Sequence, residues 1–266
     1  MPILFSGYLS LVRGYLHHWL HALNEHSLHA PLVYDLYCNV IKKDQVHPLF
    51  HPIENVRCHL LRCPDQVLVS NLGAPSRVSR QPSQSIRSVA RHGLSSPKFG
   101  RLLYRLASYN SSDCLVELGT SLGISALYLA TARPLGTVYT LEGSSALADR
   151  AEQIFCAQGR SNIHLVRGNI DHTLPNLLRQ LPQVDFAYLD ANHRYAPTVA
   201  YFEQLVTKTN ESSIIVIDDI YWSGEMQRAW RRIRQHPAVT LTIDLFDVGL
   251  VFFAPLTMRQ HYLLMF

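Results

Sequence analysis

The first 24 residues of this 266-residue chain lack the marks of a signal peptide or a membrane span. No positive charge precedes the apolar stretch, and no small-residue cleavage site follows it. A spanning helix needs about 20 mostly apolar residues, whereas polar residues recur through this stretch. The five cysteines are odd in number and show no paired zinc-ligand spacing. We therefore expect a cytoplasmic protein in a reducing compartment.

Acidic residues are absent from residues 66–112, where seven basic residues give a net charge of +7 against +4 for the whole chain. These are Arg77, Arg80, Arg87, Arg91, Lys98, Arg101 and Arg105. Two interpretations stay open: a solvated face, or a lid whose arginines receive an anionic substrate. Aromatic residues are sparse in this run before Phe99, so nucleic acid is the weaker partner.

Apolar residues in the first 24 positions recur at helical spacing and predict an amphipathic helix. They are Leu4, Tyr8, Leu11, Val12, Tyr15, Leu16, Trp19, Leu20 and Leu23. Such a helix packs on the domain or across a homodimer, or it lies in the interface of a membrane. The second interpretation predicts a membrane-peripheral protein, and both remain open.

Length and composition predict one catalytic domain with an N-terminal extension. With 47% apolar residues, the chain can bury a full core. We place a helical extension and the basic lid segment at residues 1–111, and the catalytic domain at residues 112–266. The loop at 78–84 and helices near 32–42, 53–62, 86–92 and 99–109 belong to the extension.

Strand and helix patterns alternate from residue 114 onward. Short apolar runs at 114–118, 137–142, 163–167, 185–190 and 213–218 predict strands, and helical patterns separate them. This alternation predicts a doubly wound, mostly parallel α/β sheet of Rossmann type, with ligands at the carboxyl ends of its strands. The last two strands, 239–246 and 250–254, are joined by a short turn. They must form an antiparallel hairpin.

A glycine turn follows the first of these strands, Cys114 to Leu118, and leads into a helix. Gly119 lets the backbone turn sharply, and Gly123 lets the helix pack close to the sheet. The turn differs from the G-x-G-x-x-G of dinucleotide sites, because Thr120 and Ser121 replace the second glycine. Glu117, two positions before Gly119, would repel a pyrophosphate and suits a ligand with an ammonium group.

The sequence Glu117-Leu118-Gly119-Thr120-Ser121-Leu122-Gly123 resembles motif I of class I S-adenosylmethionine-dependent methyltransferases, especially the catechol O-methyltransferase-like branch. The resemblance implies S-adenosylmethionine as cofactor and a parallel sheet closed by an antiparallel hairpin. It places Glu142, with Gly143, at the ribose, where a carboxylate accepts hydrogen bonds from both hydroxyls. It places Gly168, Asn169 and Asp171 at the adenine.

Three aspartates follow the fourth and fifth strands: Asp190, Asp218 and Asp219. If neighbouring strand ends bring them together, their carboxylates repel one another unless a hard cation such as Mg²⁺ joins them. The catechol O-methyltransferase-like resemblance implies such a magnesium site. The Asp-x-x-His spacing of Asp190 and His193 resembles macrolide-sugar O-methyltransferases, which implies His193 as catalytic base beside Asp190. Helix capping by Asp218 and Asp219 and a structural role for His193 are the open alternatives.

The predicted function is metal-assisted O-methylation of a small hydroxylated molecule, with anionic molecules among the candidate acceptors. Metal-independent methylation of a macromolecule and a non-catalytic cofactor-binding module at a membrane surface remain as alternatives. Several N-terminal segments, among them Ser96-Pro-Lys-Phe-Gly100, resemble a bacterial group of class I methyltransferases with unassigned substrates. The acceptor is therefore left open.

Overall fold

The computed structural model describes residues 14–69, 83–110 and 113–266. They divide into two compact units. The continuous unit contains Asp44–Leu181, and the discontinuous unit joins the residues up to Lys43 with Pro182–Phe266. The predicted domain boundary at residues 111 and 112 lies outside the described residues, as does most of the predicted loop at 78–84.

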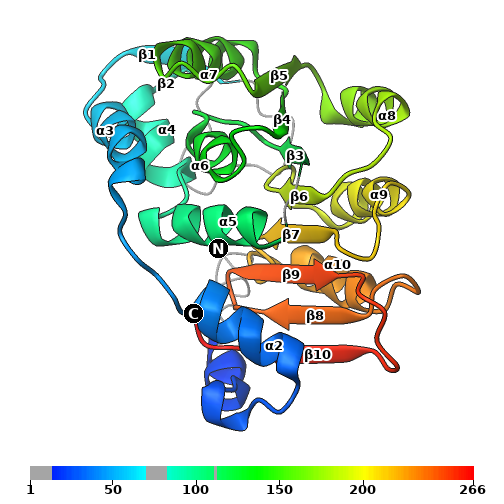
Figure 1. The fold of residues 1–266 in the computed structure, drawn as a ribbon. Helices are drawn as coiled ribbons and strands as arrows, with labels where there is room; N and C mark the ends of the chain where they lie inside the picture. Colours follow the sequence, from blue (N-terminus) through cyan, green and yellow to red (C-terminus); the bar gives the residue numbers. More distant parts are fainter. Residues whose placement is uncertain (1–13, 70–82, 111–112) are drawn as a thin grey trace, which may run out of the picture. The chain divides into compact units, whose positions relative to one another are not determined.

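The continuous unit contains three parallel strands with helices between them (Figure 1). Strands β3 (Cys114–Leu118), β4 (Thr137–Glu142) and β5 (Ile163–Arg167) pair in this order. Their connections are α6 (Ile124–Ala132), α7 (Ser145–Ala157) and α8 (Ile170–Gln180). Strand β3 is buried almost throughout, which explains its unbroken apolar pattern.

Helices that precede β3 pack beside this sheet within the same unit. They are α3 (His51–Leu60), α4 (Ile86–Gly93) and α5 (Pro97–Tyr109), with a short hairpin of β1 (Gln66–Leu68) and β2 (Ser83–Ser85). Helix α5 packs along α6, and Phe50, Ile53 and Tyr128 belong to one apolar cluster of the unit. The Tyr128 hydroxyl donates to Glu54, which also pairs with Arg57.

Two arginines of the basic segment have a structural partner. Arg101 donates to both carboxylate oxygens of Asp44, at 2.6 and 2.7 Å, and Arg105 adds a third contact at 3.0 Å. Arg87, Arg91 and Lys98 are exposed, and Arg77 and Arg80 lie outside the described residues. The lid therefore stays a prediction, with Arg101 and Arg105 already engaged by a carboxylate.

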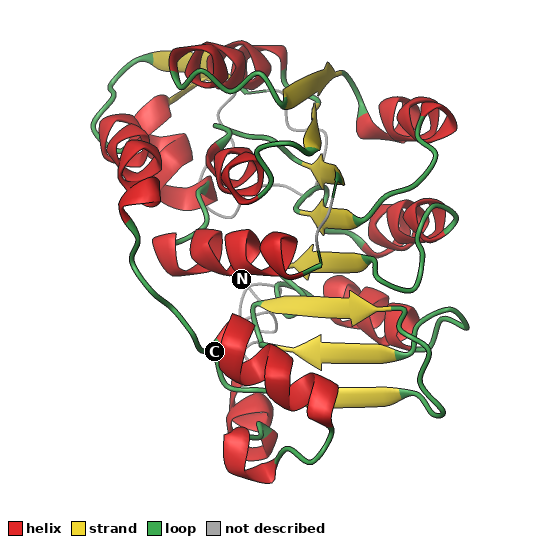
Figure 2. Cartoon of the chain, in the orientation of Figure 1, coloured by secondary structure: helices red, strands yellow, loops and turns green. Residues whose placement is uncertain are grey.

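The discontinuous unit contains five strands in the order β10-β8-β9-β7-β6 (Figure 2). They are β6 (Phe186–Leu189), β7 (Ile214–Asp218), β8 (Leu241–Asp244), β9 (Val248–Phe252) and β10 (Gln260–Leu263). The predicted antiparallel hairpin is present as β8 and β9. Strand β10, parallel to β8, was not predicted. Helices α9 (Tyr195–Val206) and α10 (Gly224–Arg234) pack on each other.

N-terminal residues complete the discontinuous unit. A helix spans residues 14–21, Glu25–Ser27 form one 3-10 turn, and α2 (Pro31–Asp35) continues as a wider π-helix, Leu36–Ile41. A further 3-10 turn, Pro48–Phe50, begins the continuous unit. Leu23 forms a parallel bridge with Leu264, so this segment lies beside the last residues of the chain.

The helix at residues 14–21 buries a polar side chain and exposes apolar ones. His18 is 5% exposed, whereas Tyr15, Leu16, Trp19 and Leu20 are each more than half exposed. His18 Nε2 lies 3.1 Å from the backbone oxygen of Asp244. The first part of the predicted stripe, Leu4 to Val12, lies outside the described residues. Across residues 14–69, 83–110 and 113–266, none of the helices is long and apolar enough to cross a membrane.

Gly123, which precedes α6, is predicted to tolerate no side chain. Its φ of 79° is left-handed, and an added Cβ would lie 2.5 Å from the Phe155 ring. We expect Gly123→Ala to lower the free energy of unfolding by about 2–4 kcal/mol, from backbone strain and overpacking. Gly159 is the matched control, because its φ is 62° but nothing lies within 4 Å of an added Cβ. Gly159→Ala should cost only about 1 kcal/mol in urea unfolding, and equal losses would contradict the packing argument.

Candidate functional site

The turn after β3 is held against the end of β4 by backbone hydrogen bonds. The amides of Gly119 and Thr120 both donate to the Leu141 carbonyl, at 3.0 and 3.2 Å. Gly119 has a φ of 98°, a conformation that a side chain would disfavour, and Ser121 is left-handed at 49°. The sequence predicted this sharp turn from its glycines. It did not predict the left-handed Ser121.

Glu142, predicted to contact the ribose, ties the turn to α7. One carboxylate oxygen accepts from the Ser121 amide and the other from the Ser144 amide, both at 2.8 Å. Ser144 occupies the N-cap position of α7, yet its own side chain forms no capping hydrogen bond. Glu142 therefore also accepts a backbone hydrogen bond at the beginning of α7.

Glu117 is fully buried beneath the turn. Its Oε2 accepts a 2.5 Å hydrogen bond from the Thr140 hydroxyl, which is 2.6 Å from the Thr120 hydroxyl. Thr140 lies opposite Glu117 in the register of β3 and β4. Sequence analysis missed Thr140, because only the register of two separate strands reveals a polar pair inside apolar runs.

The predicted adenine residues follow β5. Gly168 has a φ of 124°, and its amide donates to the Glu142 carbonyl at 2.9 Å, so the ends of β4 and β5 are joined. Asn169 caps α8 by accepting from the Asp171 amide at 3.0 Å. Asp171 is exposed on the first turn of α8, and Gly143 lies between Glu142 and Ser144. Their contacts with a cofactor remain predictions.

The predicted catalytic residues meet at the ends of β6 and β7. His193 Nε2 lies 3.3 Å from Asp190 Oδ1, and His193 Nδ1 lies 3.6 Å from Asp219 Oδ2. His193 and Asp219 have left-handed backbones, with φ of 47° and 56°. Non-glycine residues in this region carry strain and concentrate at functional sites. The imidazole therefore stands between two carboxylates that follow different strands.

Asp218 is held by neighbours that sequence analysis did not identify. The Tyr188 hydroxyl donates to its Oδ2, and the Asp219 amide donates to its Oδ1 at 2.9 Å. Burial raises the pKa of Asp218 well above its usual value, and the negative charges of Asp190 and Asp219 raise it further. Helix capping is not its role, since Ser223 caps α10. Sequence analysis missed Tyr188, because it lies within the unbroken apolar pattern of β6.

The surroundings of His193 move its pKa from the ordinary histidine value near ~6.5. Burial lowers the pKa of His193, but the hydrogen bond to Asp190 and the charges of Asp190, Asp219 and Asp218 outweigh it. The net result is a pKa of about 9. At neutral pH the imidazole is therefore protonated, and it is the positive charge that offsets the three carboxylates.

The carboxylates have the chemistry of a magnesium site, since hard cations prefer oxygen ligands. Burial is the larger cause of the raised pKa of Asp218, and the repulsion from Asp190 and Asp219 that adds to it is what a cation would relieve. Among the residues that the structure describes, no three His, Cys, Asp or Glu side chains are arranged to hold a metal ion. His193 instead occupies the space between Asp190 and Asp219, and the metal ligands stay a prediction.

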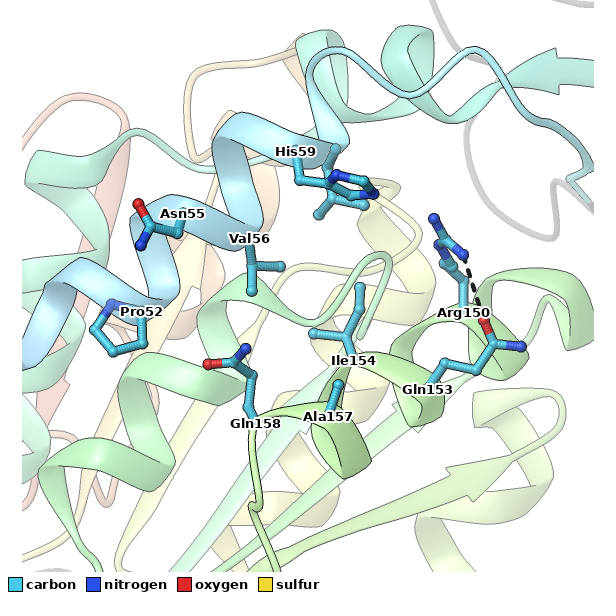
Figure 3. Close-up of a pocket in the computed structure, with 10 residues that line it drawn as sticks. Pro52, Asn55, Val56, His59, Arg150, Gln153, Ile154, Ala157 and Gln158 are labelled. Atoms are coloured by element: carbon cyan, nitrogen blue, oxygen red, sulfur yellow. Dashed lines mark hydrogen bonds between the residues drawn. The ribbon is translucent and has the colours of Figure 1, made fainter.

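A groove of about 590 Å³ lies between α3 and α7 in the continuous unit (Figure 3). Val56 of α3 and Ile154 of α7 face each other across it, and Arg150 lies near one end with a 3.4 Å hydrogen bond to Gln153. None of the predicted cofactor or catalytic residues lines this groove. It is therefore separate from the glycine turn and from the strand ends.

Comparison with known proteins agrees with the glycine turn and the strand ends. Residues 116–220, which include Glu117, Glu142, His193 and Asp218, match the family described as methyltransferase domain. This segment is a methyltransferase domain. It is similar to catechol O-methyltransferase-like enzymes of class I, as the resemblance of motif I predicted.

The curated relatives match this chain over only part of their own length. A mouse transmembrane O-methyltransferase homolog is 33% identical over 104 residues, 37% of this chain and 40% of that protein. The catechol O-methyltransferase of Niastella koreensis is 28% identical over 134 residues, 49% of this chain and 60% of that protein. The chain thus spans about half the length of these relatives.

A solved structure shows the same fold. The methyltransferase of Podospora anserina bound to S-adenosylhomocysteine has a TM-score of 0.60 and 17% identity, and the match covers 88% of this chain and 100% of that one. The predicted fold class, a Rossmann-like methyltransferase sheet with a terminal antiparallel hairpin and N-terminal helices, is confirmed.

We expect the Glu142 carboxylate to stabilise the turn of the methyltransferase domain. In Glu142→Gln, the amide oxygen can replace one acceptor, but the NH₂ group would face a second N–H donor. Loss of one charge-assisted hydrogen bond should lower the free energy of unfolding by about 2 kcal/mol in urea titration. Glu152→Gln is the control, because that exposed carboxylate pairs with Arg167 and should cost less than about 1 kcal/mol. Equal effects would mean that the two amide contacts contribute little.

Proposed function

We propose that this protein transfers the methyl group of S-adenosylmethionine to a hydroxyl of a small molecule. The observation that carries the proposal is the position of His193 between the carboxylates of Asp190 and Asp219, in a methyltransferase domain. A side chain able to accept a proton stands where strand ends of this fold class gather ligands. The names of the mouse and Niastella relatives support oxygen as the acceptor atom.

The glycine turn is proposed to hold the cofactor. Glu117 and Glu142 place negative charge at this turn, which suits a ligand that carries ammonium and sulfonium groups. Glu142 would accept the ribose hydroxyls in addition to the amides of Ser121 and Ser144. The backbone of Gly119, Thr120, Ser121, Gly123, Gly143 and Gly168, with Asn169 and Asp171, would surround the remainder of the cofactor.

His193 is proposed to take the proton of the acceptor hydroxyl. When bound, S-adenosylmethionine would supply the methyl group to the acceptor oxygen, so that an O–C bond forms, the S–C bond breaks and S-adenosylhomocysteine leaves. Asp190 orients the imidazole through the 3.3 Å contact and stabilises it once it is protonated. Holding the acceptor and the methyl group in one geometry contributes as much as roughly 7–11 kcal/mol.

Asp190, Asp218 and Asp219 are the residues that would hold a magnesium ion. Such an ion lowers the pKa of a hydroxyl that binds it, which lets a base of modest strength act at neutral pH. Its charge would also offset that of the carboxylates around His193. The support for this proposal is their shared location and the raised pKa of Asp218.

We expect His193→Gln to lower kcat by about 10²–10⁴ while leaving the affinity for S-adenosylhomocysteine unchanged. The measurement is transfer of labelled methyl to catechol as the probe acceptor. Without added cation, the wild-type rate should rise with pH toward about 9, because the base must lose its proton, and the variant should lack this rise. His236→Gln is the control, since His236 also contacts a carboxylate, Glu203, at 3.1 Å. Full activity of His193→Gln would overturn the assignment.

Magnesium should raise the melting temperature of the wild type, and EDTA should reverse the rise. Asp219→Asn removes one predicted ligand, so this variant should gain less from magnesium than the wild type does. Asp149→Asn, an exposed carboxylate on α7, should respond as the wild type does. An equal magnesium response of both variants would remove Asp219 from the ligand set.

A further inference from the structure

A second pocket, of about 330 Å³, lies in the discontinuous unit away from the predicted catalytic residues. It is lined by Arg231, Arg234 and Gln235 at the end of α10, by Thr242 of β8, and by Arg259, Gln260 and His261 at the start of β10. Three guanidinium groups thus share one cavity. No acidic side chain belongs to its described lining.

The register of the strands places this pocket far from the end of β7. Asp218 pairs with Val248, whereas Ile214, at the other end of β7, pairs with Phe252. Phe252 also pairs with Leu241, and Leu241 pairs with Gln260. The pocket residue Gln260 is therefore at the level of Ile214, one strand length from Asp218.

The arginines of the pocket are oriented but not neutralised. Arg259 donates to the carbonyls of Val239 and His236, both at 3.1 Å, which fixes its plane and leaves further N–H groups. In the described part of the chain, no carboxylate forms an ion pair with Arg231 or Arg234. Asp244 is the acidic group that acts on Arg234, and its oxygens already accept from Tyr221, Trp230 and Phe246.

His261 adds an unused polar atom to the lining. Its Nδ1 is 2.8 Å from the Thr242 hydroxyl, and its buried Nε2 has no hydrogen-bond partner among the described residues. Burial, and then the charge of Arg234, lower the pKa of His261 to about 4. The ring is therefore neutral at pH 7. If Thr242 donates to Nδ1, Nε2 carries a proton with no acceptor.

The dipole of helix α10 does not by itself explain why Arg231, Arg234 and Arg259 share one pocket. Arginines in the last turn of a helix gain about 0.3–1 kcal/mol from its dipole, which applies to Arg231, Arg232 and Arg234 alike. Arg232 does not line the pocket, although Arg231 and Arg232 are both exposed. Arg231 and Arg234 are three positions apart, on one face of the helix, and Arg259 joins them from a different segment.

We propose that this pocket binds a phosphate-type anion that carries more than one charge, such as a pyrophosphate or a phosphorylated small molecule. Planar guanidinium groups match phosphate oxygens with paired hydrogen bonds. The anion offsets the repulsion between Arg231 and Arg234 and accepts from the unused donors of the lining. This site is independent of the proposed methyl transfer, because none of its residues is a predicted cofactor or catalytic residue.

Calorimetry of the full chain with sodium pyrophosphate, at ionic strength held constant with sodium chloride, tests the proposal without cofactor or acceptor. We expect saturable 1:1 binding that Arg231→Gln weakens at least about tenfold, the effect of one charge-assisted hydrogen bond. Arg232→Gln, on the same helical turn but outside the pocket, should bind as the wild type does. Absence of saturable binding, or equal weakening by both variants, would overturn the proposal.

Two further measurements report on the pocket itself. Saturating pyrophosphate should raise the pKa of His261 from about 4 in an NMR titration of its ring, and an unchanged value would place the anion elsewhere. Arg259→Gln should also weaken binding, but Arg259 holds two carbonyls, so Arg231→Gln remains the deciding variant. Flotation with vesicles containing phosphatidic acid distinguishes a lipid headgroup, whose binding Arg231→Gln would abolish, from a soluble phosphate, which gives no flotation.

Discussion

Negative charge gathered at the ends of β6 and β7 is the constraint on which the proposed chemistry depends. Asp190, Asp218 and Asp219 lie near one another, and burial makes their repulsion costly. In the structure, His193 lies between two of the carboxylates, and the pKa of its imidazole is raised. Its positive charge therefore reduces the repulsion between them. The imidazole can serve as a base only when its proton is released, so the charge balance around it controls the proposed reaction.

The conformation of the glycine turn depends on backbone geometry rather than on charge repulsion. Left-handed residues bring the turn back toward β4, and the carboxylate of Glu142 fixes it to the beginning of α7. Glu117 is anchored below by Thr140. The turn is therefore held by charged and backbone hydrogen bonds before any ligand arrives, and little conformational freedom remains to be lost on binding.

Local patterns in the sequence predicted the strand and helix alternation, the hairpin of β8 and β9 and the glycine turn, because each depends on neighbouring residues. Strand β10 was missed, since Gln260 and His261 do not form an apolar run and its partner β8 is distant in sequence. The raised pKa of His193 was not predicted either, because it depends on charges that follow two different strands. Tyr188 was missed for the same reason, because its hydroxyl donates a hydrogen bond to Asp218, a residue 30 positions away.

The discontinuous unit has a consequence for how the chain is made. His18 bonds to Asp244, 226 positions later, and Leu23 forms a bridge with Leu264. The ribosome therefore makes this segment well before its partners, whereas Asp44–Leu181 emerges as one uninterrupted stretch. Until those partners follow, the segment is unpaired and its exposed apolar side chains are open to chaperones.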